Sequence, residues 1–230
     1  MAISNETFCG AVIVAAGTAS RMGGIDKVMA ELKGEPMIVR TVRTFQNCEA
    51  IGEIVIVTRG DLVEKIMALC AEFSKVKAVV VGGADRPESV RNGLNALSEQ
   101  VKLVAVQDGA RPLITPTVIE RTVHAAQIHG AAAPGVLVKD TVKIVKDDTV
   151  QETPDRATLR AIQTPQIFDL SLLQKALIKA KKENASITDD CSAVERLGIP
   201  VKIVDGDERN IKITTPMDLK IASLLLEEMK

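Results

Sequence analysis

The sequence predicts an α/β fold in which one doubly wound, mostly parallel sheet carries a projecting β-hairpin arm. Short runs of β-branched residues alternate with segments of helical periodicity over most of the chain, and the turns between them are short. The alternation breaks once, at about residues 139–160, where two polar–apolar stretches flank a turn. The 230 residues suffice for one large α/β domain, so we expect a single domain over residues 1–230 with the arm inserted in it.

The strands are predicted from short runs of valine and isoleucine, which favour a buried, pleated backbone. In chain order the runs lie at residues 12–14, 53–58, 77–81, 103–106, 131–138, 161–168 and 201–204, followed by a strand-like segment at 210–214.

The helices are predicted from apolar residues that recur every three or four positions and from residues typical of helix ends. The apolar stripes lie at residues 36–47, 61–73, 90–97, 117–129 and 171–184. We expect the third of these helices to start near Ser89. Thr188 or Asp189 suits the N-cap of a further helix, and Thr215-Pro216 opens the last one with proline in its first turn.

The arm is predicted from alternation at residues 140–145 and 149–153, with Lys146-Asp147-Asp148 as the turn. An isolated hairpin is only marginally stable in water, so we expect it to pack against another surface. A second copy of the chain is one such surface, and the arm's own domain is the alternative.

The first predicted strand leads into a loop of small residues that carries two cations, Arg21 and Lys27. Where side chains are small, backbone N–H groups can approach and bind an anion closely. The stretch therefore predicts a cradle for a nucleoside triphosphate, and a plain strand-to-helix turn is the alternative. It is not a P-loop, because no Gly-Lys-Ser/Thr follows, and it lacks the second glycine of the dinucleotide fingerprint. Thr58-Arg59-Gly60 also stands where a dehydrogenase would place an acidic residue, which disfavours NAD binding.

Two further polar loops, at residues 82–89 and 107–112, also follow predicted strands. Ligands of doubly wound sheets bind beyond the carboxyl ends of the strands, so we expect the three loops to converge on one crevice.

Composition excludes several classes of function. Aromatic residues make up 2% of the chain and the net charge is −1, which argues against nucleic-acid binding through stacked bases or a basic surface. The four cysteines have no metal-site spacing, and His124 and His129 are five residues apart, which does not suit an i, i+4 metal pair. With no long apolar run and no apolar leader before the first strand, we expect a soluble cytoplasmic protein with no membrane contact.

Taken together, the motifs resemble those of one family. They are AAGTASRM with Lys27, GGADRPESVRNGL, VQDGARP, VKDTVK, RATLRAIQTPQIF, TDDCSAVE and GDERNIKITTPMDL. In this order they resemble the 2-C-methyl-D-erythritol 4-phosphate cytidylyltransferase family of non-mevalonate isoprenoid precursor biosynthesis, which has a Rossmann-like nucleotidyltransferase sheet. Ribitol-5-phosphate cytidylyltransferase shares most of these motifs and is the alternative. Two features depart from the family pattern: Gln107 and Gly109 replace residues usual beside the aspartate, and the loop at residues 23–26 is short.

The resemblance implies transfer of CMP from CTP to a polyol phosphate with release of pyrophosphate. It implies that Arg21, Lys27 and Lys212 neutralise the charge that develops at the α-phosphate. The implied nucleotide-binding residues are Ala15, Ala16, Gly17, Thr18, Ala19, Ser20, Gly83, Asp85 and Ser89. An N-cap role is the alternative for Ser89.

For the second substrate the resemblance points to Asp108, Arg111, Thr141 and Arg156. The last two lie on or beside the arm, which in this family reaches across a homodimer, so they would serve the neighbouring subunit. Asp108 is also the implied carboxylate for Mg²⁺, with a hydroxyl of the substrate or ribose as its alternative partner. A regulatory module that binds nucleotide without turnover is a further alternative.

Overall fold

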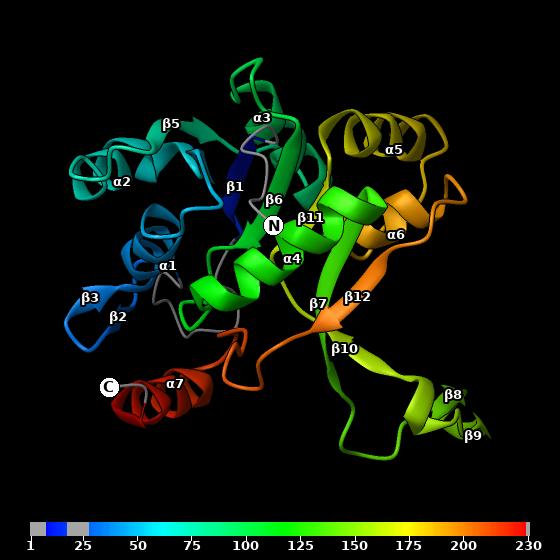
Figure 1. The fold of residues 1–230 in the computed structure, drawn as a ribbon. Helices are drawn as coiled ribbons and strands as arrows, with labels where there is room; N and C mark the ends of the chain where they lie inside the picture. The colour runs from blue at the N-terminus through cyan, green and yellow to red at the C-terminus, as the bar shows by residue number, and fades with distance from the viewer. Residues whose placement is uncertain (1–7, 18–27, 229–230) are drawn as a thin grey trace, which may run out of the picture.

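A computed structural model describes residues 8–17 and 28–228 (Figure 1). Its centre is an eight-stranded sheet in the order β10-β7-β11-β6-β1-β4-β5, with β12 also paired to β7. The strands of this sheet are β1 (Cys9–Ala15), β4 (Glu53–Thr58), β5 (Val76–Val81), β6 (Leu103–Asp108), β7 (Ala131–Leu137), β10 (Arg160–Ile162), β11 (Gln166–Asp169) and β12 (Lys202–Asp205). The helices are α1 (Met37–Gln46), α2 (Val63–Leu69), α3 (Arg86–Asn95), α4 (Pro116–His129), α5 (Leu170–Lys182), α6 (Asp190–Glu195) and α7 (Pro216–Glu228).

The sheet is mostly parallel, as predicted. β1 pairs in parallel with β4 on one side and β6 on the other, and β4 pairs in parallel with β5. β11 is antiparallel to both β6 and β7, so those two strands share one direction. β10 is also antiparallel to β7, whereas β12 is parallel to it. Only β10 and β11 therefore run against the other strands of the described sheet.

Helices cover both faces of the sheet, which makes it doubly wound. Successive residues of β1 alternate between the faces: Ile13 packs in the cluster that includes α1, α2 and α4, and Val12 packs in the cluster with α3, α5 and α6. Gly93 lets α3 lie close to the sheet, because a Cβ there would be 2.4 Å from Val12 Cγ1 and 2.8 Å from Val57 Cγ2. A third cluster joins α7 to the short hairpin of β2 (Glu31–Leu32) and β3 (Glu35–Pro36).

Three predicted elements need correction. The third predicted helix starts at Arg86 rather than near Ser89, because Asp85 caps it and Pro87 occupies its first turn. The predicted strand at residues 161–168 is two strands, β10 and β11, which pair with different neighbours. Residues 210–214 form no strand: the backbone N–H of Ile213 donates to Ala110 O at 2.9 Å, but no ladder follows.

The predicted arm is a hairpin of β8 (Ile144–Lys146) and β9 (Thr149–Glu152), which projects from the body of the domain (Figure 1). Every residue of both strands is exposed, and its apolar side chains include Ile144, Val145 and Val150. The two strands pair with each other in a sheet of their own and are exposed, which does not favour the alternative of a flap folded on its own domain. That the arm packs against a second copy of the chain stays a prediction.

Other expectations concern the chain as a whole. All four cysteines are free and buried, and both histidines are exposed on α4. Residues 8–17 and 28–228 contain no cluster of three metal-ligating side chains and no helix with the length and hydropathy to cross a bilayer.

Candidate active site

A cavity of about 540 Å³ opens at the carboxyl ends of β1, β4, β5 and β6. It is lined by Val14, Ala15, Ala16, Gly17, Val28, Arg59, Gly83, Ala84, Asp85, Arg86, Ser89, Asp108, Ala110 and Lys212. The three polar loops predicted to converge contribute to this wall, which confirms the crevice. It has room for a nucleotide-sized ligand.

Small residues at the ends of β1 and β5 bring two backbone segments together. A Cβ on Gly82 would lie 2.5 Å from the Cβ of Ala16 and 2.9 Å from Ser89 Oγ. Only glycine fits there without displacement of the loop. The small residues therefore serve close packing of the cavity wall as well as access to backbone N–H groups.

The loop before α3 is fixed by its own side chains. Glu88 N donates to Asp85 Oδ1 at 2.7 Å, so Asp85 is the N-cap. The Ser89 hydroxyl donates to Asp85 O at 2.9 Å and accepts from Gly83 N at 3.0 Å. The alternative N-cap role for Ser89 is therefore wrong, and its hydroxyl instead shapes the loop that faces the cavity.

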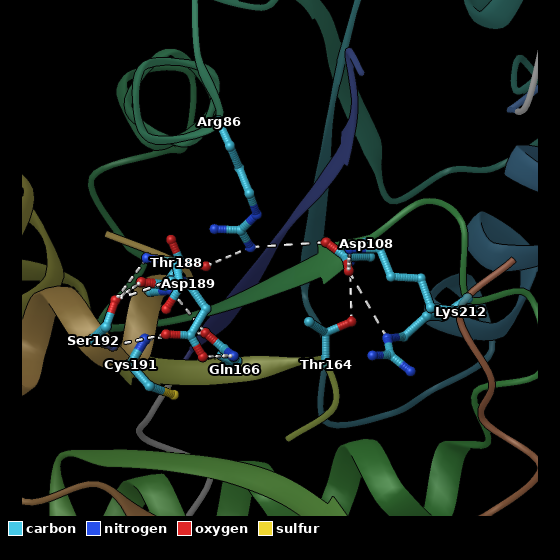
Figure 2. A network of polar contacts seen from close by, with 11 residues as sticks. Arg86, Asp108, Thr164, Gln166, Thr188, Asp189, Cys191, Ser192 and Lys212 are labelled. Carbon is cyan, nitrogen blue, oxygen red and sulfur yellow. Dashed lines mark hydrogen bonds and ion pairs between the residues drawn. The ribbon is translucent and has the colours of Figure 1, made fainter. Parts of the chain in front are cut away.

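Asp108, the last residue of β6, is the carboxylate at the centre of the site. Its Oδ2 lies 2.7 Å from Lys212 Nζ and 3.9 Å from Arg111 Nε, and its Oδ1 lies 3.8 Å from Arg86 Nη2 (Figure 2). Burial acts to raise the pKa of Asp108, but the surrounding cations outweigh it and hold the pKa below its usual value. Asp108 is therefore an anion at neutral pH, and it orients the cations around it.

Lys212 reaches Asp108 because the residues on either side of it are anchored. Asn210 is fully buried, and its amide donates to Thr164 O at 3.0 Å. The backbone carbonyl oxygen of Asn210 accepts from Arg111 Nη1 at 2.6 Å. On the other side, Ile213 is fully buried and bonded to Ala110. The segment is thus held without a strand, and the lysine between the anchors faces the cavity.

Arg86 and Arg59 also line the cavity, and sequence reasoning did not single out either of them. Arg86 Nη2 lies 2.7 Å from Asp190 Oδ2, and Asp190 is 1% exposed. Arg59 makes a fork to Asp61, with contacts of 3.1 and 3.0 Å. The position of Arg86 within GGADRPESV was an available signal, because the motif had already been assigned to the nucleotide loop. Asp190 lies in the TDDCSAVE motif, but nothing local to it indicates a contact with Arg86, which is 104 residues away in sequence.

The structure brings together many of the predicted site residues. Lining the cavity are Ala15, Ala16, Gly17, Gly83, Asp85, Ser89, Asp108 and Lys212, and Arg111 packs beside Asp108. Thr141 and Arg156 are exposed at the base of the arm and do not line the cavity. Arg156 Nη1 instead donates to Lys139 O at 2.6 Å. Thr18, Ala19, Ser20, Arg21 and Lys27 lie outside the described residues.

Comparison with known proteins identifies the family. The model of the family 2-C-methyl-D-erythritol 4-phosphate cytidylyltransferase (IspD) matches residues 9–228. A protein of that name from Symbiobacterium thermophilum is 46% identical over 94% of this chain and 92% of its own length. Another, from Caldanaerobacter subterraneus subsp. tengcongensis, is 43% identical over 95% and 98%. The crystal structure of 4-diphosphocytidyl-2C-methyl-D-erythritol synthase from Anaerococcus prevotii superposes with a TM-score of 0.88 at 34% identity, covering 96% of this chain and 97% of its own. The chain therefore belongs to the 2-C-methyl-D-erythritol 4-phosphate cytidylyltransferase family.

Proposed function

We propose that the chain transfers CMP from CTP to 2-C-methyl-D-erythritol 4-phosphate and releases pyrophosphate. The observation that carries the proposal is the convergence of Lys212 and Arg86 on Asp108 inside a cavity walled by the loop after β1. Family membership adds the identity of the two substrates.

The reaction is a displacement at the α-phosphorus of CTP. An oxygen of the acceptor's phosphate attacks that phosphorus, the bond to the bridging oxygen of the β-phosphate breaks, and pyrophosphate leaves with the electron pair. The attacking phosphate is already an anion at neutral pH, so no general base is needed. This agrees with the exposed positions of His124 and His129 on α4, away from the cavity lining.

The protein's part is then to position the phosphates and to neutralise charge at the α-phosphate. Lys212 stands at the cavity with its ammonium group on Asp108, from which it can transfer to an incoming phosphate oxygen. We assign the same task to Arg21 and Lys27 of the small-residue loop. The backbone of residues 16–20 would hold the triphosphate.

Asp108 fits the role of a single carboxylate ligand for Mg²⁺. Mg²⁺ often takes one or two carboxylates, keeps several waters and binds substrate phosphates. Asp108 is the last residue of β6 and reaches the cavity beside Lys212. When bound, the ion would offset negative charge on the triphosphate.

For the acceptor we propose Arg111 and Asp108 from one subunit and Thr141 and Arg156 from the partner's arm. Arg156 and Thr141 are exposed at the base of a hairpin that extends away from its own domain. An arginine fork suits a phosphate monoester. We therefore propose a homodimer joined through residues 139–160.

We also propose a cytoplasmic location, because the four cysteines are free thiols, which suit a reducing compartment.

The test is pyrophosphate release from CTP with each of two acceptors, 2-C-methyl-D-erythritol 4-phosphate and ribitol 5-phosphate. Release with the first acceptor, and at most a small fraction of that rate with the second, is expected. Release with ribitol 5-phosphate alone would overturn the assignment of the acceptor. Binding of CTP without turnover with either acceptor would instead indicate a regulatory module.

A further inference from the structure

A line of charged side chains connects α6 to the carboxylate of the cavity. Figure 2 shows Arg86 extending from the start of α3 toward Asp108 on one side and the start of α6 on the other. The Arg86 guanidinium lies 2.7 Å from Asp190 and 3.8 Å from Asp108. The guanidinium is therefore closer to Asp190, which does not line the cavity, than to Asp108, which does.

Asp190 is fixed by the backbone on which it sits. The N–H groups of Asp190 and Cys191 donate to Gln166 Oε1 at 3.0 and 3.1 Å, and Gln166 Nε2 donates to Asp189 Oδ2 at 2.8 Å. Asp189 in turn caps α6 by accepting from Ser192 N at 2.9 Å. The start of α6 is thus bonded to β11, next to β6 in the sheet, so the Asp190 carboxylate has a set position relative to Asp108.

The burial of Asp190 gives it a strong requirement for a cation. Its side chain is 1% exposed, and a buried unpaired carboxylate is strongly destabilising, so the Arg86 guanidinium is retained there. Oδ1 of Asp190 has no hydrogen-bond partner among the described residues, which leaves Arg86 as its principal compensation. Arg86 is nonetheless part of the cavity wall, where a purely structural ion pair has no need to be.

The unequal distances have a consequence for Lys212. With Arg86 held by Asp190, Lys212 at 2.7 Å is the closest cation to Asp108 Oδ2, and Arg111 Nε lies 3.9 Å from the same oxygen. If Arg86 were released, its guanidinium would have a carboxylate within reach and would compete with Lys212 for it. An arginine fork binds a carboxylate bidentately, so the competition would favour the arginine.

We infer that Asp190 is a positioning residue of this site: it holds the Arg86 guanidinium in the cavity wall and keeps it from displacing Lys212 on Asp108. The inference rests on the proposed function, because the effect is felt through Lys212 in cytidylyl transfer. It assigns no direct contact between Asp190 and either substrate.

The test uses the full-length protein and compares Asp190→Asn, Arg86→Gln and the double variant. Asp190→Asn is expected to lower kcat/KM for CTP by about 10-fold or more, in line with the loss of one placed charge-stabilising group. KM for the acceptor should stay within about 3-fold, because Asp108 keeps Arg111 beside it and the other two proposed ligands, Thr141 and Arg156, do not line the cavity. Since Asp190 acts through Arg86, the double variant should be no worse than the more impaired single variant.

A matched control is Glu183→Gln, which removes the 2.7 Å contact between Arg196 and Glu183 at the ends of α5 and α6, away from the cavity. Its kcat/KM should equal that of the wild type. Isothermal titration with CTP on each variant gives a second readout. A Kd within about 5-fold of wild type for Asp190→Asn, together with the loss in turnover, indicates misplacement of Lys212 rather than collapse of the pocket.

Three outcomes would overturn the inference while the wild type remains active: unchanged kcat/KM in Asp190→Asn, losses that multiply in the double variant, or an equal loss in Glu183→Gln. If Asp190→Asn does not fold, Arg86→Lys decides the matter. Lysine at position 86 can still pair with Asp190 but places no guanidinium in the cavity wall, so a loss of about 10-fold in kcat/KM is expected, and wild-type kcat/KM would refute the inference. An inactive wild type would instead refute the proposed function, which keeps the two failures apart.

Discussion

Asn210 is a sharp test of how the site is held together, because it is not itself proposed to bind a substrate and yet anchors the segment that carries Lys212. Its amide donates to Thr164 O at 3.0 Å and to Gln163 Oε1 at 3.3 Å, and its backbone oxygen accepts from Arg111. Asn210→Ala removes the two amide bonds and keeps the backbone one.

The size of the effect follows from burial. Asn210 is 0% exposed, and loss of its bond to Thr164 O leaves a buried acceptor without that partner, at about 1–3 kcal/mol. Gln163 Oε1 still accepts from Asp207 N at 3.2 Å, so loss of the second bond costs less. Asn210 Oδ1 itself is buried without a hydrogen-bond partner, and its removal offsets part of that loss. We therefore expect a net loss of about 2 kcal/mol, which lowers Tm by about 4–8 °C in a chain of this length.

The effect on activity should exceed the effect on stability. A displacement of about 1 Å at Lys212 is enough to lower kcat/KM about 100-fold in pyrophosphate release. The matched control is Asn92→Ala, since Asn92 also donates an amide hydrogen bond to a backbone oxygen, Val81 O at 3.0 Å, but is not among the residues that line the cavity. Asn210→Ala with wild-type kcat/KM would refute the argument that the anchor places the lysine, whatever its Tm.

Three further predictions concern separate parts of the chain. Gly82→Ala places a Cβ 2.5 Å from the Cβ of Ala16, so we expect KM for CTP to rise about 10-fold in steady-state kinetics; an unchanged KM would show that the loop can yield. Arg156→Ala should raise KM for the acceptor far more than KM for CTP, and equal damage to both would contradict its assignment to the acceptor phosphate. Burial raises the pKa of the Cys70 thiol from 9.0 to about 11, and all four cysteines are buried, so a thiol reagent at pH 8 should react only after denaturation. Because the fold favours the neutral thiol, its contribution to stability is complete below pH 9.0 and is lost as the pH rises toward 11, which an alkaline melting series can follow.

Much of the fold is local enough to be predicted from sequence. The run at residues 53–58 is bounded by turn-forming residues, and β4 has the predicted bounds. The apolar stripe of α3 begins only at Val90, which predicts a later start, whereas Asp85 and Pro87 are the local signals that match the observed start at Arg86. Residues 210–214 alternate as a strand would, but a strand also needs a partner along its length, which sequence alone does not provide.

The candidate site could likewise be predicted from the sequence only in part. Asp108 and Lys212 belong to motifs that follow predicted strands, and the topology of a doubly wound sheet brings such loops to one edge. The role of Arg86 depends on Asp190, which is 104 residues away in sequence and reaches it only through the packing of α6 against the sheet. Contacts of that kind are products of tertiary structure and leave no periodic pattern in the chain.

The crowding of cations around Asp108 has a consequence for how the site responds to salt. Lys212, Arg86 and Arg111 surround one carboxylate, whereas the chain as a whole has a net charge of −1. The field that attracts a triphosphate is therefore short-ranged and confined to the cavity, and it has little support from the rest of the surface. At physiological ionic strength the Debye length is about 8 Å, which is shorter than the approach path to such a cavity. Added salt should thus slow the encounter with CTP only slightly, and should act mainly by weakening the bound state through competition of small anions for the same cations.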